Sequence, residues 1–234
     1  MGKYLNLGIA PSGIYETVLH AIRPLQGMRV LDAPCGSGGF AQQLADEGAT
    51  CVAVDVTPAA QYKPAVIADM NGSLPFSEGY FDAVTCIEGI EHIHDPFHVI
   101  REFYRLLRPG GRLFLSTPNI HNFRSRIKFL LRGTLFWFDP REINGVGHVN
   151  VVPYFILKHI LREAGFTDIS VHPNQTIPPY VPTFVCSLMQ RCLSKPTEDD
   201  LELNSTALLN AECLIVFASK QHGCEEISEP IRRT

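Results

Sequence analysis

The sequence lacks several features that would assign it to a special class of protein. It has no Cys-x-x-Cys pair, no internal repeat and no apolar run that approaches the ~20 residues of a membrane span. Its formal net charge is only −4, which argues against a general electrostatic nucleic-acid binder. The first residues show no signal-peptide pattern. We therefore expect residues 1–234 to form one globular domain, a length that suits a single α/β core.

The cysteines are scattered, and several of them lie in apolar runs. Because free cysteines are among the most buried residue types, we expect reduced thiols in the core and a cytoplasmic setting. The seven residues are Cys35, Cys51, Cys86, Cys186, Cys192, Cys213 and Cys224.

The segment 29–39 is the clearest local signal. A short apolar strand ends at Asp32, a glycine-rich turn with Gly36 and Gly38 follows, and a helical pattern begins after it. Strand, glycine loop and helix together hold nucleotide-like ligands at a helix N-terminus. Glycine permits close approach of the backbone to the ligand, because a Cβ atom there would collide with it.

Two cofactors compete for this loop. The run that begins at Gly36 fits the dinucleotide pattern G-x-G-x-x-A, and Asp55 lies about 20 residues further on, where a ribose-binding acid is expected. Asp32 argues against NAD, since its carboxylate would face the negatively charged pyrophosphate. An acid at this position suits a positive group, such as the α-amino group of S-adenosylmethionine.

The other apolar runs indicate a mainly parallel sheet covered on both faces. The second strand ends at Asp55, whose carboxylate can accept both ribose hydroxyls. The third is followed by Asp69 and Met70, a polar and an apolar residue that together suit an adenine ring. Asp95 and Pro96 predict the start of a helix. The expected strands are 30–32, 50–56, 65–68, 81–87 and 112–116, with an antiparallel edge pair at 166–171 and 211–219.

Taken in order, these motifs resemble the class I S-adenosylmethionine-dependent methyltransferases. The resemblance is strong over the cofactor half, about 28–116, and weaker to residue 220. It implies a doubly wound, Rossmann-like α/β fold whose seven-stranded sheet is mainly parallel with an antiparallel edge strand. The motifs are Val30-Leu31-Asp32, Gly36-Ser37-Gly38, Val54-Asp55, Asp69, Leu74-Pro75-Phe76, Phe81-Asp82, Glu91-His92 and Leu107-Arg108-Pro109-Gly110-Gly111.

The resemblance also implies roles for individual residues. Asp32 and the glycine loop would hold the methionine end of the cofactor, Asp55 the ribose, and Asp69 with Met70 the adenine. Pro34 departs from the family, which usually has a glycine there, and it removes a backbone donor. The implied cofactor-binding residues are Asp32, Ala33, Pro34, Gly36, Gly38, Asp55, Val56, Asp69, Met70 and Ile87.

Glu88, Glu91 and His92 are the candidate catalytic residues. On one helical turn, their spacing would bring all three side chains to one face. They could then hold a divalent ion, Mg²⁺ or Zn²⁺, that lowers the pKa of an acceptor hydroxyl. The Glu-x-x-Glu-His pattern resembles the ubiquinone-pathway O-methyltransferases and the small-RNA terminal 2′-O-methyltransferases, and the latter have a later histidine that His148 matches. In the alternative without metal, His92 orients the substrate or acts as a general base.

Two further segments carry open alternatives. In the expected acceptor-side cap, 119–150, the stretch 121–138 mixes arginine and lysine with aromatic residues. It could form a basic amphipathic helix on an anionic membrane, a lid over a hydrophobic substrate, a single-stranded RNA site or a simple cap. The negative net charge makes nucleic acid unlikely. The insertion 173–204 has a proline-rich start and an apolar segment at 184–193, which could be a second cap, a membrane-dipping element or a dimer contact.

The function expected from the sequence is S-adenosylmethionine-dependent methylation of a hydroxyl group. The acceptor would be a small molecule, a lipid-linked precursor or a sugar. Two alternatives from other classes are an NAD-dependent oxidoreductase and a non-catalytic S-adenosylmethionine-binding partner protein.

Overall fold

The computed structural model describes residues 10–58, 60–145, 147–175, 182–185 and 197–222, and its centre is a seven-stranded sheet. The strand order is β3-β2-β1-β4-β5-β7-β6, and β7 runs in the opposite direction to the other six strands. The predicted fold class is therefore confirmed. The strands are β1 (Arg29–Asp32), β2 (Thr50–Asp55), β3 (Ala65–Ile67), β4 (Phe81–Cys86), β5 (Leu107–Pro118), β6 (Phe166–Pro173) and β7 (Cys213–Lys220).

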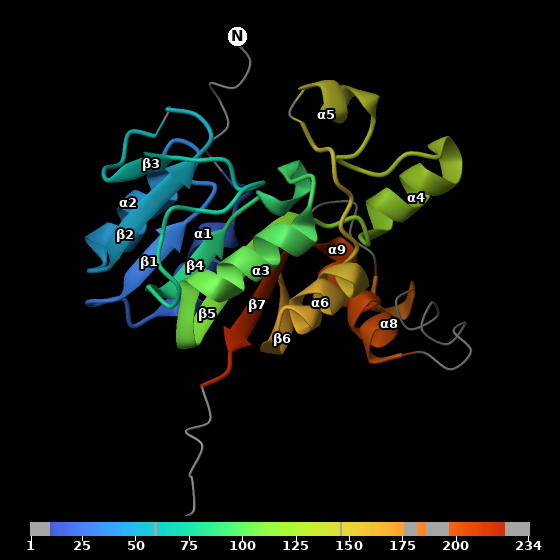
Figure 1. The fold of residues 1–234 in the computed structure, drawn as a ribbon. Helices are drawn as coiled ribbons and strands as arrows, with labels where there is room; N and C mark the ends of the chain where they lie inside the picture. Colours follow the sequence, from blue (N-terminus) through green and yellow to red (C-terminus); the bar gives the residue numbers. More distant parts are fainter. Residues whose placement is uncertain (1–9, 59, 146, 176–181, 186–196, 223–234) are drawn as a thin grey trace, which may run out of the picture.

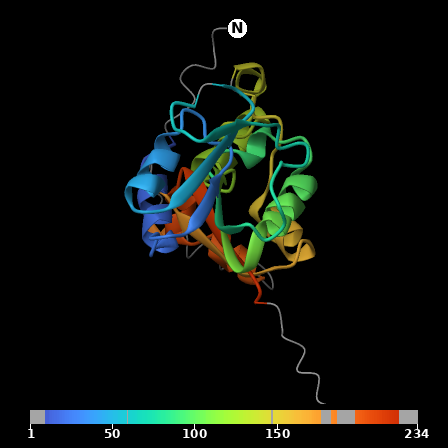
Figure 2. The ribbon, with the colours of Figure 1, turned by 60° about the vertical axis from the view of Figure 1, so that its left-hand side comes forward.

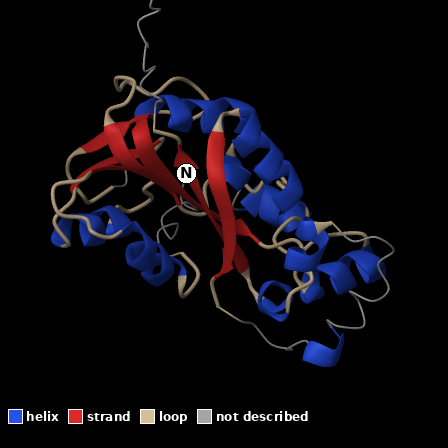
Figure 3. Ribbon diagram, turned by 90° about the horizontal axis from the view of Figure 1, so that it is seen from below, coloured by secondary structure: helices blue, strands red, loops and turns tan. Residues whose placement is uncertain are grey.

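Helices lie on both sides of this sheet (Figures 1 and 3). Asp95 begins α3 as predicted, since its carboxylate accepts a hydrogen bond from the N–H of His98 and Pro96 follows. No described helix combines the length and the apolar character needed to cross a bilayer. The helices are α1 (Ile14–Ile22), α2 (Gly39–Asp46), α3 (Pro96–Leu106), α4 (Phe123–Arg132), α5 (Pro140–Gly145), α6 (Tyr154–Glu163), α8 (Glu198–Leu203) and α9 (Thr206–Asn210), with a 3₁₀ turn, η1, at Ile90–His92.

The alternation of side chains along the central strands divides the core between two faces. Leu31 and Val84 pack in a cluster with apolar residues of α3 and α6, whereas Val30 and Ala83 pack with those of α1 and α2. Figure 2 shows these two helix pairs on opposite sides of the sheet. Burial of each leucine or valine contributes about 1.5–3 kcal/mol to folding, so apolar residues on both faces are what allow a sheet of this kind to be covered twice.

The start of β5 differs from the prediction. Pro109-Gly110-Gly111 was expected to separate a helix from a strand that begins at Arg112, but β5 already begins at Leu107. Leu107 pairs with Phe81 and Arg112 pairs with Ala83, so the intervening residues bulge out of the ladder. Gly110 permits this bulge because its φ of 77° lies in the left-handed region.

The basic segment 121–138 is not one helix. Asn122 caps the start of α4 by accepting a hydrogen bond from the N–H of Ser125, and Gly133, with φ of 69°, ends it. A bridge between Leu135 and Phe138 follows, and α5 begins at Pro140. A helix with basic and apolar residues therefore forms over only part of this segment, because a left-handed glycine terminates it after ten residues.

Some predictions fall partly or wholly outside the described residues. Within the insertion 173–204 the structure describes 173–175, 182–185 and 197–204, so most of the proline-rich and apolar stretches lie outside. Four cysteines are free and buried as predicted: Cys35, Cys51, Cys86 and Cys213. The other three lie outside the described residues.

Candidate active site

The polar candidates gather at the carboxyl edge of the parallel strands. Asp32 is the last residue of β1 and pairs with Thr85 of β4, and Asp55 is the last residue of β2. Glu91 and His92 follow the end of β4 in η1. Because parallel strands end at the same edge, residues separated by some 60 positions in the sequence come to the same edge of the sheet.

Asp32 is an unusually buried acid. Its side chain is 1% exposed, and the hydroxyl of Thr85 donates a hydrogen bond of 2.7 Å to it. Burial raises the pKa of Asp32 to about 7, although the Thr85 hydroxyl and the N–H of Ala41 favour its charged form. A positive group of a ligand would restore the charge of this carboxylate.

Asp55 joins the end of β2 to the glycine loop. Its carboxylate accepts hydrogen bonds of 2.9 Å from the backbone N–H of Gly36 and from both the N–H and the hydroxyl of Thr57. The side chain is 9% exposed, so it lies at the border between core and solvent. The acid predicted to bind ribose therefore also holds the loop in place.

The glycine loop is closed by the segment that follows β2. The carbonyl of Ser37 accepts a hydrogen bond from Gln61, and Gly38 packs against Tyr62. A Cβ atom on Gly38 would lie 2.6 Å from the Cβ of Tyr62, and the φ of Gly38 is 86°. Only glycine fits both constraints.

The positions predicted to contact adenine are divided between surface and core. Asp69 is exposed and accepts two hydrogen bonds from Asn71, whereas Met70 is buried. Val56 is 65% exposed directly after Asp55. Ile87, which follows β4, is buried in the α1–α2 core. These residues surround the carboxyl ends of β2 to β4, and their contacts with a cofactor stay a prediction.

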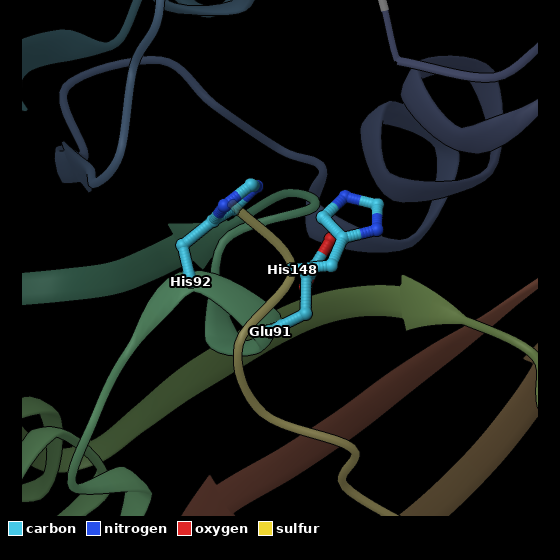
Figure 4. A group of neighbouring side chains, drawn as sticks. All are labelled: Glu91, His92 and His148. Carbon is cyan, nitrogen blue, oxygen red and sulfur yellow. The ribbon is translucent and has the colours of Figure 1, made fainter. Parts of the chain in front are cut away.

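Glu91, His92 and His148 form a compact group that could hold a metal ion (Figure 4). One ligand atom of each lies within 4.8 Å of those of the others. His148 reaches the group from the strap that joins α5 to α6, and this strap is fixed because the N–H groups of Val149 and Asn150 both donate to the carbonyl of Glu91.

In both histidines Nδ1 lies against a backbone carbonyl, so Nε2 is the ring nitrogen that can accept a proton or bind a metal ion. Nδ1 of His92 lies 3.1 Å from the carbonyl oxygen of Gly147, and Nδ1 of His148 lies 2.8 Å from that of Trp137. A carbonyl oxygen can only accept, so each neutral ring carries its hydrogen on Nδ1 and its lone pair on Nε2. Backbone orientation of this kind is typical of metal-binding histidines. Burial lowers the pKa of His92, which favours the neutral form.

Glu91 has an incomplete set of partners. It is fully buried, and the hydroxyl of Thr117 donates to one carboxylate oxygen at 3.2 Å, while no described group bonds to the other, Oε1. Burial, together with the nearby charge of Glu88, raises the pKa of Glu91 well above its usual range. An unpaired buried oxygen costs stability unless a cation or a proton compensates it. The donor set of one carboxylate and two imidazoles therefore fits a divalent ion.

Glu88 is separate from this group. It was expected to share a helical face with Glu91 and His92, but η1 begins only at Ile90. Glu88 instead has a φ of 47°; Ser116 donates to its carboxylate at 2.7 Å, and the thiol of Cys213 is at 3.5 Å. Burial raises the pKa of Glu88 to about 7. The idea that all three side chains lie on one helical face is wrong, because the chain turns sharply before the 3₁₀ turn begins.

A family model described as "Methyltransferase domain" matches residues 13–171. The chain belongs to this methyltransferase family. The match confirms the resemblance predicted from the ordered motifs, and it covers every residue of the candidate site. Membership of this family accounts for the strand order and the glycine loop of the methyltransferase domain.

Curated relatives of the methyltransferase domain point to one branch. A protein of Xanthomonas oryzae pv. oryzae named ubiquinone biosynthesis O-methyltransferase is 37% identical, over 43% of this chain and 52% of the relative. A protein of the same name from Paracidovorax citrulli is also 37% identical, over 43% of this chain and 48% of that protein. The chain thus spans about half the length of the curated relatives it matches.

Solved structures resemble the methyltransferase domain over most of its length. A SAM-dependent methyltransferase from Archaeoglobus fulgidus has a TM-score of 0.63 and 20% identity, covering 88% of this chain and 93% of its own. The [4+2]-cyclase SpnF has a TM-score of 0.60 and 19% identity, covering 89% and 80%. At such identities the similarity shows the fold alone.

The threonine hydroxyls that hold the acids of the methyltransferase domain were not predicted as their hydrogen-bond partners. Thr85 and Thr117 hold the two buried acids Asp32 and Glu91, and Thr57 holds Asp55. The signal available for Thr85 was a lone hydroxyl inside an apolar strand. The carbonyl of Trp137, which orients His148, gives no sequence signal, because every residue has a carbonyl.

Proposed function

We propose that this methyltransferase domain transfers the methyl group of S-adenosylmethionine to a hydroxyl group of a small molecule. The observation that carries the proposal is the proximity of two unlike sites at one sheet edge. Asp32 ends β1, the group of Glu91, His92 and His148 follows the adjacent strand β4, and Asp32 pairs with Thr85 in that ladder. A cationic cofactor and a polar acceptor group would therefore meet there.

The cofactor side supports S-adenosylmethionine. The carboxylate of Asp32 would pair with the α-amino group, and Asp55 would receive the ribose hydroxyls while it continues to hold the loop at Gly36. The N-terminus of α2, which begins at Gly39, would face the cofactor carboxylate with its positive end. NAD-dependent oxidation, the first alternative from the sequence, gains no support from the family match.

The acceptor side supports attack by a hydroxyl oxygen. The oxygen attacks the methyl carbon in line with the sulfonium, the carbon–sulfur bond breaks, and its electron pair stays on sulfur to give S-adenosylhomocysteine. The hydroxyl proton passes to Nε2 of His92, whose lone pair is available because Nδ1 carries the ring hydrogen. The protein contributes chiefly by holding the oxygen ~3 Å from the methyl group.

A divalent cation fits the same group. Glu91, His92 and His148 would hold it, and when bound it would lower the pKa of the acceptor hydroxyl and fix its orientation. His92 would then serve as a ligand and not as the base. The curated relatives are named O-methyltransferases, which supports oxygen as the methylated atom, and a phenolic hydroxyl suits this chemistry because it ionises more readily than an alcohol.

The experiment combines cofactor binding with methyl transfer. Titration calorimetry with S-adenosylhomocysteine should show binding, and a screen of phenols and alcohols with methyl-labelled S-adenosylmethionine should show transfer that His92→Ala abolishes. His159→Ala, an exposed histidine of α6, is the matched control. Absence of binding would reject the proposal. Binding without transfer to any acceptor would favour the second alternative, a non-catalytic cofactor-binding partner protein.

A further inference from the structure

The last two turns of α4 present an uncovered apolar stripe. Ile127, Leu130 and Leu131 stand at positions i, i+3 and i+4 and therefore share one face of the helix. Leu130 is 78% and Leu131 is 74% exposed, and the neighbouring Phe129 is 57% exposed. In Figure 1 this end of α4 projects from the body of the domain at the upper right. Adjacent exposed leucines indicate a surface that something else covers.

Among the described residues, α4 packs on the domain mainly through its first half. Ser125 is its one buried residue, and Phe123 packs against Leu209 and Val185. Gly133 then ends the helix while its apolar stripe still faces solvent. The helix therefore begins against the body of the domain and ends in solvent.

The charges around the stripe are positive. The ten residues of α4 include four cations and no acid, although the chain as a whole has a net charge of −4. Lys128 is paired with Asp139, whereas the guanidinium of Arg124 lies 4.5 Å from the ring centroid of Phe136 and Arg132 is exposed in the last turn. The cationic groups flank an apolar face, as in helices that lie in a membrane interface.

We propose that the outer end of α4 docks on an anionic lipid bilayer. Leu130 and Leu131 enter the boundary between headgroups and acyl chains, and Arg124 and Arg132 pair with lipid phosphates. A second copy of the chain fits less well, because a twofold contact through this face would bring the same cations together. The inference is independent of the proposed reaction.

A bilayer docked on α4 would lie close to the candidate site. The hydroxyl of Ser125 in α4 accepts a hydrogen bond of 3.0 Å from the N–H of Phe136, and the next residue, Trp137, accepts from His148 through its carbonyl. Figure 1 shows α4 and α5 together beyond the carboxyl ends of the parallel strands. A bilayer bound at α4 would therefore face the edge of the sheet that carries the candidate site.

Vesicle flotation of the full chain tests the proposal. The wild-type chain should float with vesicles that contain phosphatidylglycerol and stay in solution with pure phosphatidylcholine. Leu130→Ser/Leu131→Ser should lower the bound fraction at least tenfold, while Leu201→Ser, an exposed leucine of α8, should leave it unchanged. Arg132→Glu should weaken binding more than Arg101→Glu, which changes an exposed arginine of α3. Unchanged thermal unfolding of each variant should show that only the surface was altered.

Three results would overturn the proposal. The wild-type chain could ignore anionic vesicles at low salt, or the double leucine variant could bind as well as the wild type. Sedimentation could instead show a dimer that the double variant loses, and the stripe would then be an interface between two copies.

Discussion

The carboxylate of Asp55, at the end of β2, accepts a hydrogen bond of 2.9 Å from the backbone N–H of Gly36 in the loop after β1. The same residue is the predicted ribose acid, so one side chain both shapes the loop and would bind the cofactor. Asp55→Ala should weaken S-adenosylhomocysteine binding about 10- to 100-fold, since hydrogen bonds to a charged group are worth about 1.5–3 kcal/mol. Calorimetry with Asp46→Ala, an exposed acid of α2, as control would check this, and an unchanged affinity would contradict it.

Gly38 and Gly39 are neighbours with opposite tolerance for a side chain. Gly38→Ala should lower stability by about 1–3 kcal/mol, because it combines a left-handed φ with a clash against Tyr62. At Gly39 the nearest atom to a new Cβ is the Ser37 hydroxyl at 3.9 Å, so Gly39→Ala should be neutral or stabilising by about 0.5 kcal/mol. Urea unfolding of both variants tests the pair, and equal losses would refute the assigned cause.

Asp32 should make cofactor binding depend on pH. The pKa of the free carboxyl is about 7 because it is buried, and a cationic amino group binds only the ionised form. Affinity should therefore rise as pH increases through 7, by about tenfold between pH 6 and 8, with protons released on binding. Calorimetry in buffers of different ionisation enthalpy measures that release.

The control for this pH dependence is Glu88→Gln, since the pKa of Glu88 also lies at about 7. The dependence should persist in Glu88→Gln and disappear in Asp32→Asn, where weak binding should be the same at every pH. If Glu88→Gln instead lost the pH dependence, Glu88 and not Asp32 would be its source.

The metal hypothesis predicts that substitutions at Glu91 and at Glu88 affect metal binding differently. Glu91→Gln and His148→Ala should each lower the affinity for Zn²⁺ or Mg²⁺ at least about tenfold, because the first removes the negative charge of the group and the second removes one donor. Glu88→Gln should have little effect, since Ser116 and Cys213 already occupy its carboxylate. Direct metal titration of chelator-treated protein decides between them. Equal losses in all three variants would bring Glu88 into the ligand set.

Glu102 should contribute stability that depends on pH. Arg105 holds the pKa of this buried carboxyl below its usual range, and the N–H of Leu74 also donates to it. Because the folded-state pKa is the lower one, the contribution is present above the unfolded value near 4.5 and is lost as pH falls through the folded value. Glu102→Gln should cost about 1–3 kcal/mol at pH 7 and much less at pH 3. Denaturant unfolding tests this, with exposed Glu163→Gln as control.

The cofactor half could be predicted because its signals are local. A strand that ends in an acid, a glycine loop and a helix follow each other in the sequence. The predicted strands are present in the sheet, and Asp32 and Asp55 are the last residues of β1 and β2. The site around Glu91 was harder, since His148 reaches it only through a strap whose amides bond to the carbonyl of Glu91. Spacing alone placed Glu88 with Glu91, but the φ of 47° at Glu88 rotates it away. This turn is accompanied by contacts of Glu88 with Ser116 and Cys213, which are distant in the sequence, so a local sequence pattern does not predict it.

The position of β7 has a consequence for the order of synthesis. This strand is the last of the sheet to be made, yet it fills the gap between β5 and β6. Residues 112–118 of β5 pair with it position by position, so their outer edge has no partner until residues 213–219 have left the ribosome. A bare strand edge readily pairs with other chains. The sheet is therefore completed only after Cys213–Lys220 has been translated, and a nascent chain that stalls before Cys213 carries an open template for aggregation.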